Sequence, residues 1–235
     1  TIQTAYMATI AASVMVAYAS FGAEPGHLLA ASLMSAPAAI ALAKLMVPET
    51  GTPETGSAAH RFEMPVESVN VFDAAARGAA TGLNMALNVG ALLIVFVGLI
   101  FLLDKGATAL TGEKLTVILG VAFRPFAWLM GVPGPDIRTA SELLATKTVF
   151  NEFLAYQQLQ TLIADGALSR RSVVILTYAL CGFANLGSMG ILIGGLSALA
   201  PERRAEIARL SLWAVVSGTL ASFCTACIAG MLAAE

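Results

Sequence analysis

The chain is built from apolar runs of about twenty residues, the length that an α-helix needs to cross the hydrocarbon core of a membrane. Of its 235 residues, 57% are hydrophobic and only 12% are charged, whereas charged residues make up about a quarter of a typical soluble domain. Continuous apolar runs of this length fold as helices, because lipid offers no hydrogen bonds to an open backbone. The sequence therefore predicts an all-α polytopic membrane protein that crosses the cell membrane several times.

The apolar runs and the polar segments between them predict the order of the elements. A solvent-exposed loop, rich in proline and acidic residues, is expected at 48–70, and a final span at 207–234. Residues 137–162 are apolar but carry several charges, and residues 172–200 form a long run with glycines at its centre. Basic residues flank the run at 172–200 on both sides, so the positive-inside rule does not orient it. The other expected helical segments are 4–21, 28–47, 90–103 after an amphipathic start at 71, and a buried or interfacial helix at 115–132.

Glu152 is a carboxylate inside an otherwise apolar segment. A charge in the membrane interior costs several kcal/mol, so such a residue indicates a functional site that faces a cavity or a partner. Lys147 precedes it by five residues and is an alternative explanation as a salt-bridge partner. That spacing is poor for a helix, because residues three or four apart are the ones that meet.

The stretch CGFANLGSMG at 181–190 places three glycines, an amide and a hydroxyl in the middle of a long apolar run. Each glycine costs about 1 kcal/mol in a helix relative to alanine, so the helix is expected to break here. Transporters use discontinuous helices at this depth to expose polar groups to a substrate or an ion. Close helix packing through small residues explains the glycines equally well.

The polar residue types favour binding over catalysis. A carboxylate (Glu152), an amide (Asn185) and a hydroxyl (Ser188) suit a neutral polyhydroxylated molecule, and Phe183 offers a flat apolar face beside them. The sequence shows no nucleophile with a matching base and no cluster of metal ligands, so we expect neither an enzyme nor a cofactor. A net charge of −2 with scattered basic residues gives no reason to expect nucleic-acid binding.

Four stretches resemble the concentrative nucleoside transporter family. KTVFNEFLAY at 147–156 and YALCGFANLGSMGILIGGL at 178–196 are similar to its two signature stretches. HLLAASLMSAPAAIALAKLMVPET at 27–50 and ILGVAFRPFAWLMGVP at 118–133 are similar to two further family stretches in the same order. The resemblance covers essentially residues 1–235 and implies the C-terminal, transport-carrying part, without the N-terminal scaffold helices and the first hairpin.

The resemblance also implies an architecture that spacing alone does not give. Residues 137–162 would be a re-entrant helical hairpin, and residues 172–200 a helix unwound at the Gly-Phe-Ala-Asn motif. The intact protein would be a homotrimer in the lipid bilayer, and it would move its substrate by an elevator-like shift.

Site roles carry over from the family motif by motif. Glu152 and Asn185 would bind the ribose hydroxyls with help from Ser188, Phe183 would pack against the nucleoside, and Val14 would touch the base.

The stretch ATIAASVMVAY at 8–18 is similar to the broken helix that forms the family's ion site. Thr9 and Ile10 would supply a hydroxyl and a carbonyl to the coupling sodium ion.

The leading hypothesis is therefore nucleoside import coupled to Na+ or to H+. A passive channel is the alternative, although polar residues gathered at one or two depths fit a binding site better than a continuous pore. A membrane enzyme is the third hypothesis, and the lack of a nucleophile and base counts against it. The sequence leaves open both the coupling ion and the choice between pyrimidine and purine nucleosides.

Overall fold

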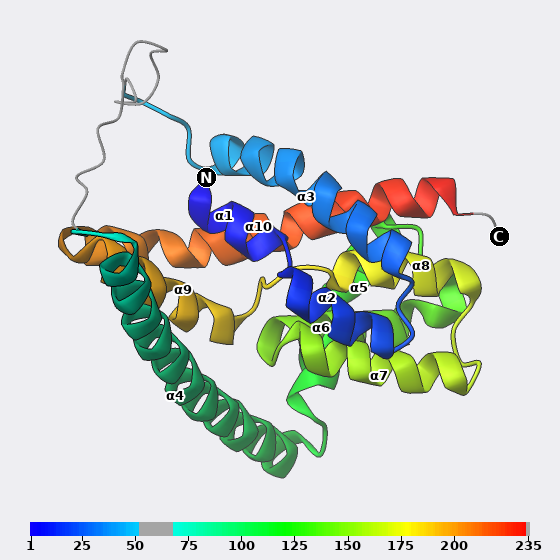
Figure 1. Cartoon of the computed structure of the whole chain (residues 1–235). Coiled ribbons are helices and arrows are strands. Elements are labelled where there is room, and N and C mark those ends of the chain that lie inside the picture. The colour runs from blue at the N-terminus through cyan, green and yellow to red at the C-terminus, as the bar shows by residue number, and fades with distance from the viewer. Residues whose placement is uncertain (52–67, 234–235) are drawn as a thin grey trace.

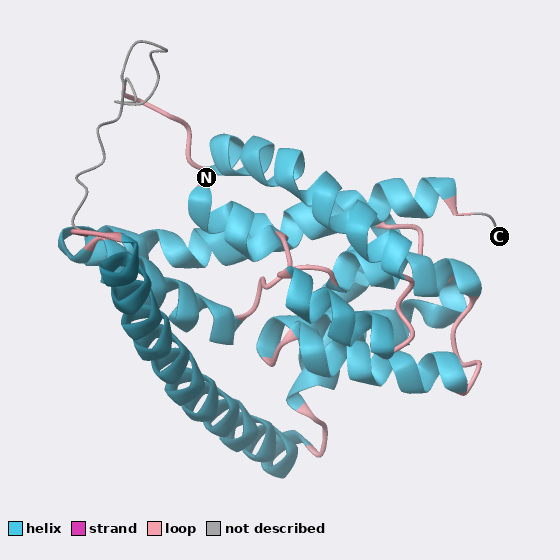
Figure 2. Cartoon of the chain, viewed as in Figure 1, coloured by secondary structure: helices cyan, strands magenta, loops and turns pink. Residues whose placement is uncertain are grey.

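The computed structural model describes residues 1–51 and 68–233, and within them the secondary structure is helical (Figures 1 and 2). The expected all-α class is confirmed for this part of the chain. The predicted loop at 48–70 lies mostly outside the described residues. The α-helices are α1 (Ile2–Ala8), α2 (Ala12–Ser20), α3 (Pro25–Met46), α4 (Val71–Thr111), α5 (Leu115–Leu129), α6 (Ile137–Val149), α7 (Glu152–Ala164), α8 (Arg170–Leu180), α9 (Leu186–Leu199) and α10 (Arg204–Leu232).

Several of these helices are long and apolar enough to cross a membrane. Among the described residues, three segments meet that requirement: Ile2–Ser20 taken across its break, Pro25–Met46 and Pro201–Leu232. The end of α4 and the whole of α5 form a fourth candidate, bent by 90°. The run at 115–132, predicted as a buried or interfacial helix, thus forms the second arm of this bent pair.

Three predicted segments are each divided into two helices. The glycine-rich run at 172–200 consists of α8 and α9, separated by residues 181–185. The charged segment at 137–162 consists of α6 and α7, which turn at residues 150–151. The first segment, which apolar content alone presents as one span at 4–21, is divided into α1 and α2 by residues 9–11.

Asparagine starts the second helix in two of the three segments. The side chain of Asn151 accepts a hydrogen bond from the backbone N–H of Leu154 at 2.9 Å, and that of Asn185 accepts one from Ser188 at 2.7 Å. These are N-caps, which satisfy N–H groups that the first turn of a helix leaves without a partner. The local sequence thus fixes where α7 and α9 begin.

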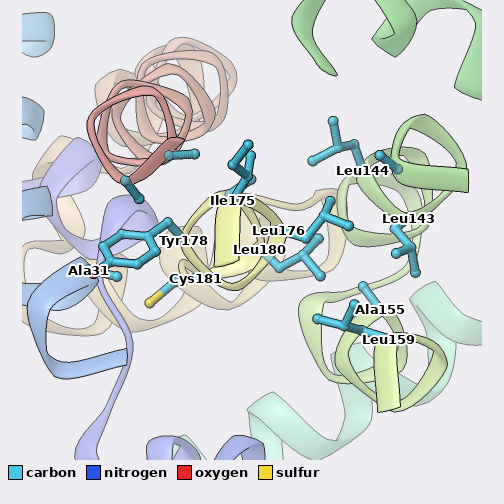
Figure 3. Close-up of a cluster of buried hydrophobic side chains, with 14 of the residues drawn as sticks. Ala31, Leu143, Leu144, Ala155, Leu159, Ile175, Leu176, Tyr178, Leu180 and Cys181 are labelled. Atoms are coloured by element: carbon cyan, nitrogen blue, oxygen red, sulfur yellow. The ribbon is translucent and has the colours of Figure 1, made fainter. Parts of the chain in front are cut away.

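The helices pack around a core drawn from many parts of the chain. Figure 3 shows part of it, with Leu143 and Leu144 of α6, Leu159 of α7 and Leu176 of α8 close together. The hairpin α6–α7 packs against both α5 and α8, and α10 crosses α3 and α8. In Figure 1, α4 extends away from this body, and its packing partners are α9 and α5.

The breaks in the first and last discontinuous helices lie against each other at Gly182. A Cβ atom on this residue would lie 2.9 Å from Oγ of Ser222 and 3.0 Å from the backbone oxygen of Ala8. Its φ of +145° is also a conformation that L side chains rarely adopt. A glycine is therefore required where the two discontinuous helices meet, so close packing and a helix break, which the sequence offered as alternatives, occur together.

Candidate functional site

Glu152 lies at the N-terminus of α7 and brings three elements together. Its side chain is buried, with 6% of the residue exposed. The hydroxyl of Tyr18 in α2 donates to Oε1 at 2.9 Å, and Nδ2 of Asn185, the N-cap of α9, donates to Oε2 at 2.8 Å. Both carboxylate oxygens are thus held by donors from other helices, as a buried carboxylate requires.

The helix ends around this carboxylate suit its charge. Glu152 sits in the first turn of α7 and contacts the N-cap of α9, so the positive ends of two helix dipoles lie beside it. Lys147, at the last turn of α6, is 1% exposed and donates from Nζ to the backbone oxygen of Ala179 at 2.8 Å. That carbonyl belongs to the C-terminal turn of α8, the negative end of its dipole. The hydrogen bond of Lys147 therefore goes to α8, and not to Glu152 as the salt-bridge alternative required.

The other predicted substrate residues lie around the break between α8 and α9. The backbone N–H of Ser188 donates to Oδ1 of Asn185, so Glu152, Asn185 and Ser188 form one hydrogen-bonded chain. Phe183, in the unwound segment, stacks at a tilt on Tyr6 of α1 with ring centroids 5.8 Å apart.

Val14 lies in the first turn of α2, where it is partly buried and packs against the main core. It lies four residues before Tyr18, and both residues belong to the helix that follows the first break. This places the predicted base contact on the same helix as a donor to Glu152.

The predicted ion residues lie at the break between α1 and α2. The backbone N–H and the hydroxyl of Thr9 both bond to the oxygen of Ala5, at 3.2 and 2.9 Å, and regular helical bonding resumes with Ala11 as acceptor. The carbonyl of Ile10 thus lies outside regular helix, the arrangement in which unwound backbone coordinates ions in transporters. The hydroxyl of Thr9, the other predicted ligand, donates its proton to Ala5 and keeps its oxygen lone pairs as acceptors. Their binding of sodium remains a prediction.

Tyr18 is the site residue that the sequence analysis missed. It is fully buried and stacks on Tyr156 of α7, with ring centroids 4.2 Å apart and an angle of 20° between the planes. A tyrosine in an apolar run is compatible with an ordinary core position. The available signal was its place one helical turn after Val14, in the stretch that resembles the family's broken helix.

A cavity of about 990 Å³ lies apart from this cluster, between the start of α1, the ends of α3 and α9 and the start of α10. None of the predicted site residues lines it. Within the described ranges, no group of three or more His, Cys, Asp or Glu side chains could hold a metal ion.

Sequence comparison identifies relatives along almost the whole chain. Residues 27–230 match the family model described as Na+ dependent nucleoside transporter C-terminus. The chain is 44% identical to the uncharacterized transporter YutK of Bacillus subtilis (strain 168), over 98% of this chain and 58% of that protein. It is 40% identical to the nucleoside permease NupC of Helicobacter pylori, over 96% and 55% of the respective lengths. The chain thus spans little more than half the length of these relatives.

Solved structures of CNTnw share the fold in more than one state. An inward-facing, substrate-bound state matches with a TM-score of 0.79 and 41% identity, over 98% of this chain and 56% of that one. A variant of CNTnw in an outward-facing state matches with a TM-score of 0.80 and 39% identity, over 98% and 57%.

Proposed function

Because this chain belongs to the family of Na+-dependent nucleoside transporters, we propose that the protein imports nucleosides by symport with sodium through alternating access. The observation that carries the proposal is the buried carboxylate of Glu152, joined to Asn185 where α7 and α9 begin. The occurrence of CNTnw in inward- and outward-facing states supports alternating access for the same fold.

The geometry at Glu152 suits a ribose. Each carboxylate oxygen offers about two lone-pair sites, and Tyr18 and Asn185 use one on each. Two donors do not exhaust the acceptor capacity of the carboxylate, and the remaining capacity suits two adjacent hydroxyls such as the 2′ and 3′ hydroxyls of a nucleoside. Ser188 assists at the start of α9.

The apolar contacts and the ion site complete the proposal. Phe183 packs against the nucleoside and Val14 touches its base, while Thr9 and Ile10 at the first break supply ligands to the sodium ion. Ion and substrate then bind at the breaks of two discontinuous helices that contact each other at Gly182.

At the level of the assembly, we infer a homotrimer in the plasma membrane whose protomers move the substrate by an elevator-like shift. The projection of α4 away from the helices that carry Glu152 supports a division into a moving and a static part.

The test is labelled uridine uptake by the full-length protein in liposomes, under an inward sodium gradient and then under a proton gradient. Glu152→Gln should abolish accumulation, because a neutral amide loses the charge-assisted acceptors on which the hydroxyls depend. Glu142→Gln is the matched control, since this carboxylate lies on the same hairpin but pairs with the exposed Arg138. Normal accumulation by the Glu152 variant would exclude the role of this carboxylate.

The same assay separates the alternatives. Accumulation driven by protons alone would retain the transporter but remove the sodium site from Thr9 and Ile10. Equilibration without accumulation under either gradient would point to a passive channel instead.

A further inference from the structure

Tyr18 donates to Glu152, yet the proposed nucleoside site gives it no role. The two residues are 134 positions apart in the sequence and come from different helices, α2 and α7. Because Asn185 donates to the other oxygen, the carboxylate accepts hydrogen bonds from two separate elements. Hydrogen bonds to a charged acceptor are short and strong, so this pair fixes the direction in which the carboxylate points.

The ring of Tyr18 cannot adjust independently of its helix. Tyr18 is fully buried and Tyr156 is 1% exposed, and the two rings stack at 4.2 Å. Tyr156 is itself anchored, because its hydroxyl donates to the backbone oxygen of Thr177 in α8 at 2.6 Å. A close-packed interior leaves no room for a ring to swing. The Tyr18 hydroxyl therefore cannot be displaced by a side-chain rotation alone, so moving it requires a shift of α2 against α7.

The other end of α2 adjoins the proposed ion site. This helix is only nine residues long, and its first residue, Ala12, follows directly on the break that holds Thr9 and Ile10. We expect a helix of this length to move as one unit, so a rearrangement of the break would shift Tyr18 relative to Glu152. One short helix and one hydrogen bond thus link the proposed ion residues to the proposed substrate carboxylate.

We propose that Tyr18 is a positioning residue that aims the Glu152 carboxylate at the substrate hydroxyls and transmits to it the state of the break between α1 and α2. This inference rests on the proposed function. Tyr18 acts through Glu152 and need not touch the substrate itself. Coupling between two binding events is reciprocal, so sodium and nucleoside should each strengthen the binding of the other through this contact.

The test compares Tyr18→Phe with Tyr178→Phe in the full-length protein, by uridine uptake into liposomes at a series of sodium concentrations. Both changes remove the hydroxyl of a buried tyrosine and keep its ring, but only the first removes a donor to Glu152, because the Tyr178 hydroxyl pairs with His27. In Tyr18→Phe, the KM for uridine should rise about tenfold or more, as expected for a lost hydrogen bond to a charged group. The dependence of that KM on sodium should flatten while the maximal rate changes little.

Tyr178→Phe should keep both the KM and its sodium dependence. Equal effects of the two variants, or an unchanged sodium dependence in Tyr18→Phe, would overturn the role of Tyr18. Wild-type protein that accumulates no uridine under sodium would instead contradict the proposed function, and the inference would fall with it.

A second measurement observes residue 18 without removing its hydroxyl. With 3-fluorotyrosine introduced at position 18, the fluorine resonance beside the hydroxyl should shift when sodium is added alone and again when uridine follows. The same label at position 178, where the hydroxyl pairs with His27, should remain unchanged by sodium. A resonance at position 18 that responds to uridine but not to sodium would refute the transmission from the break.

Discussion

At the scale of single residues, the buried charges are stabilised by helix ends and hydrogen bonds. Glu152 lies at the N-termini of α7 and α9, whereas Lys147 caps the C-terminal turn of α8. Each charge thus meets the end of a helix dipole that favours it. A segment that breaks into short helices offers more such ends than a continuous span, which is why these charges are tolerated in an apolar environment.

Lys147→Met should lower the free energy of unfolding by about 1.5–3 kcal/mol, since it removes a buried hydrogen bond from a charged donor and leaves the oxygen of Ala179 without it. Thermal unfolding of the purified protein in detergent measures the change. Lys44→Met is the control, because the Lys44–Glu49 pair is exposed and worth about 1 kcal/mol at most. Equal losses of unfolding free energy in the two variants would show that the bond to Ala179 stabilises the fold no more than an exposed ion pair does.

At the scale of elements, the site depends on the close contact of two discontinuous helices. Gly182, between α8 and α9, lies against Ala8 at the end of α1. Gly218 of α10 lies against Met7 of α1. The hydroxyl of Ser222 in α10 donates to the backbone oxygen of Cys181, which holds the break between α8 and α9 against α10. Small residues at these positions let three backbones approach closely, as is common between helices in membranes.

Gly182→Ala should destabilise the protein by about 1–3 kcal/mol and weaken uridine binding, because the added Cβ meets backbone oxygens and φ is strained. Gly106→Ala is the matched control: it lies within α4 with nothing near the added Cβ, so it should be neutral or stabilise the protein by up to about 1 kcal/mol. Thermal unfolding and uridine titration measure both effects. Unimpaired binding in Gly182→Ala would mean that this contact does not shape the site.

At the scale of the whole molecule, Asp136 ties the hairpin to the broken helix that follows it. It lies in the short turn Gly134–Asp136 before α6, outside the candidate spans. Its Oδ2 accepts from the N–H of Ser169 at 3.0 Å, the hydroxyl of Ser169 at 2.7 Å and the hydroxyl of Ser172 at 2.6 Å. Burial by itself raises the pKa of Asp136, but these hydrogen bonds outweigh it and lower the pKa below its usual value.

A lowered pKa in the folded state means that the ionised Asp136 stabilises the fold above the usual pKa of about 4. That contribution should be lost as the pH falls from there through the lower folded pKa. Melting temperatures of wild type and Asp136→Asn, measured from pH 7 downward, should therefore converge in acid. The other acids titrate in both proteins and cancel in the difference. Curves that stay parallel to the lowest pH would contradict the assignment.

The sequence by itself determined the helical class and the membrane environment, and it singled out Glu152 and Asn185 as candidate site residues. It offered a helix break at the glycine-rich motif beside close packing as an alternative. These follow from local properties: apolar content, glycine propensity and the cost of a charge in lipid. Apolar content alone did not reveal the break between α1 and α2, because a span keeps the same composition whether or not it is interrupted.

Only the tertiary structure decided that Tyr18 donates to Glu152, that Lys147 bonds to Ala179, and that Gly182 lies against Ala8. Residue spacing left each of these pairs undetermined, because spacing predicts partners only within one helix, three or four positions apart. These partners come from different helices, so their contact depends on how helix faces pack once the chain has turned back on itself.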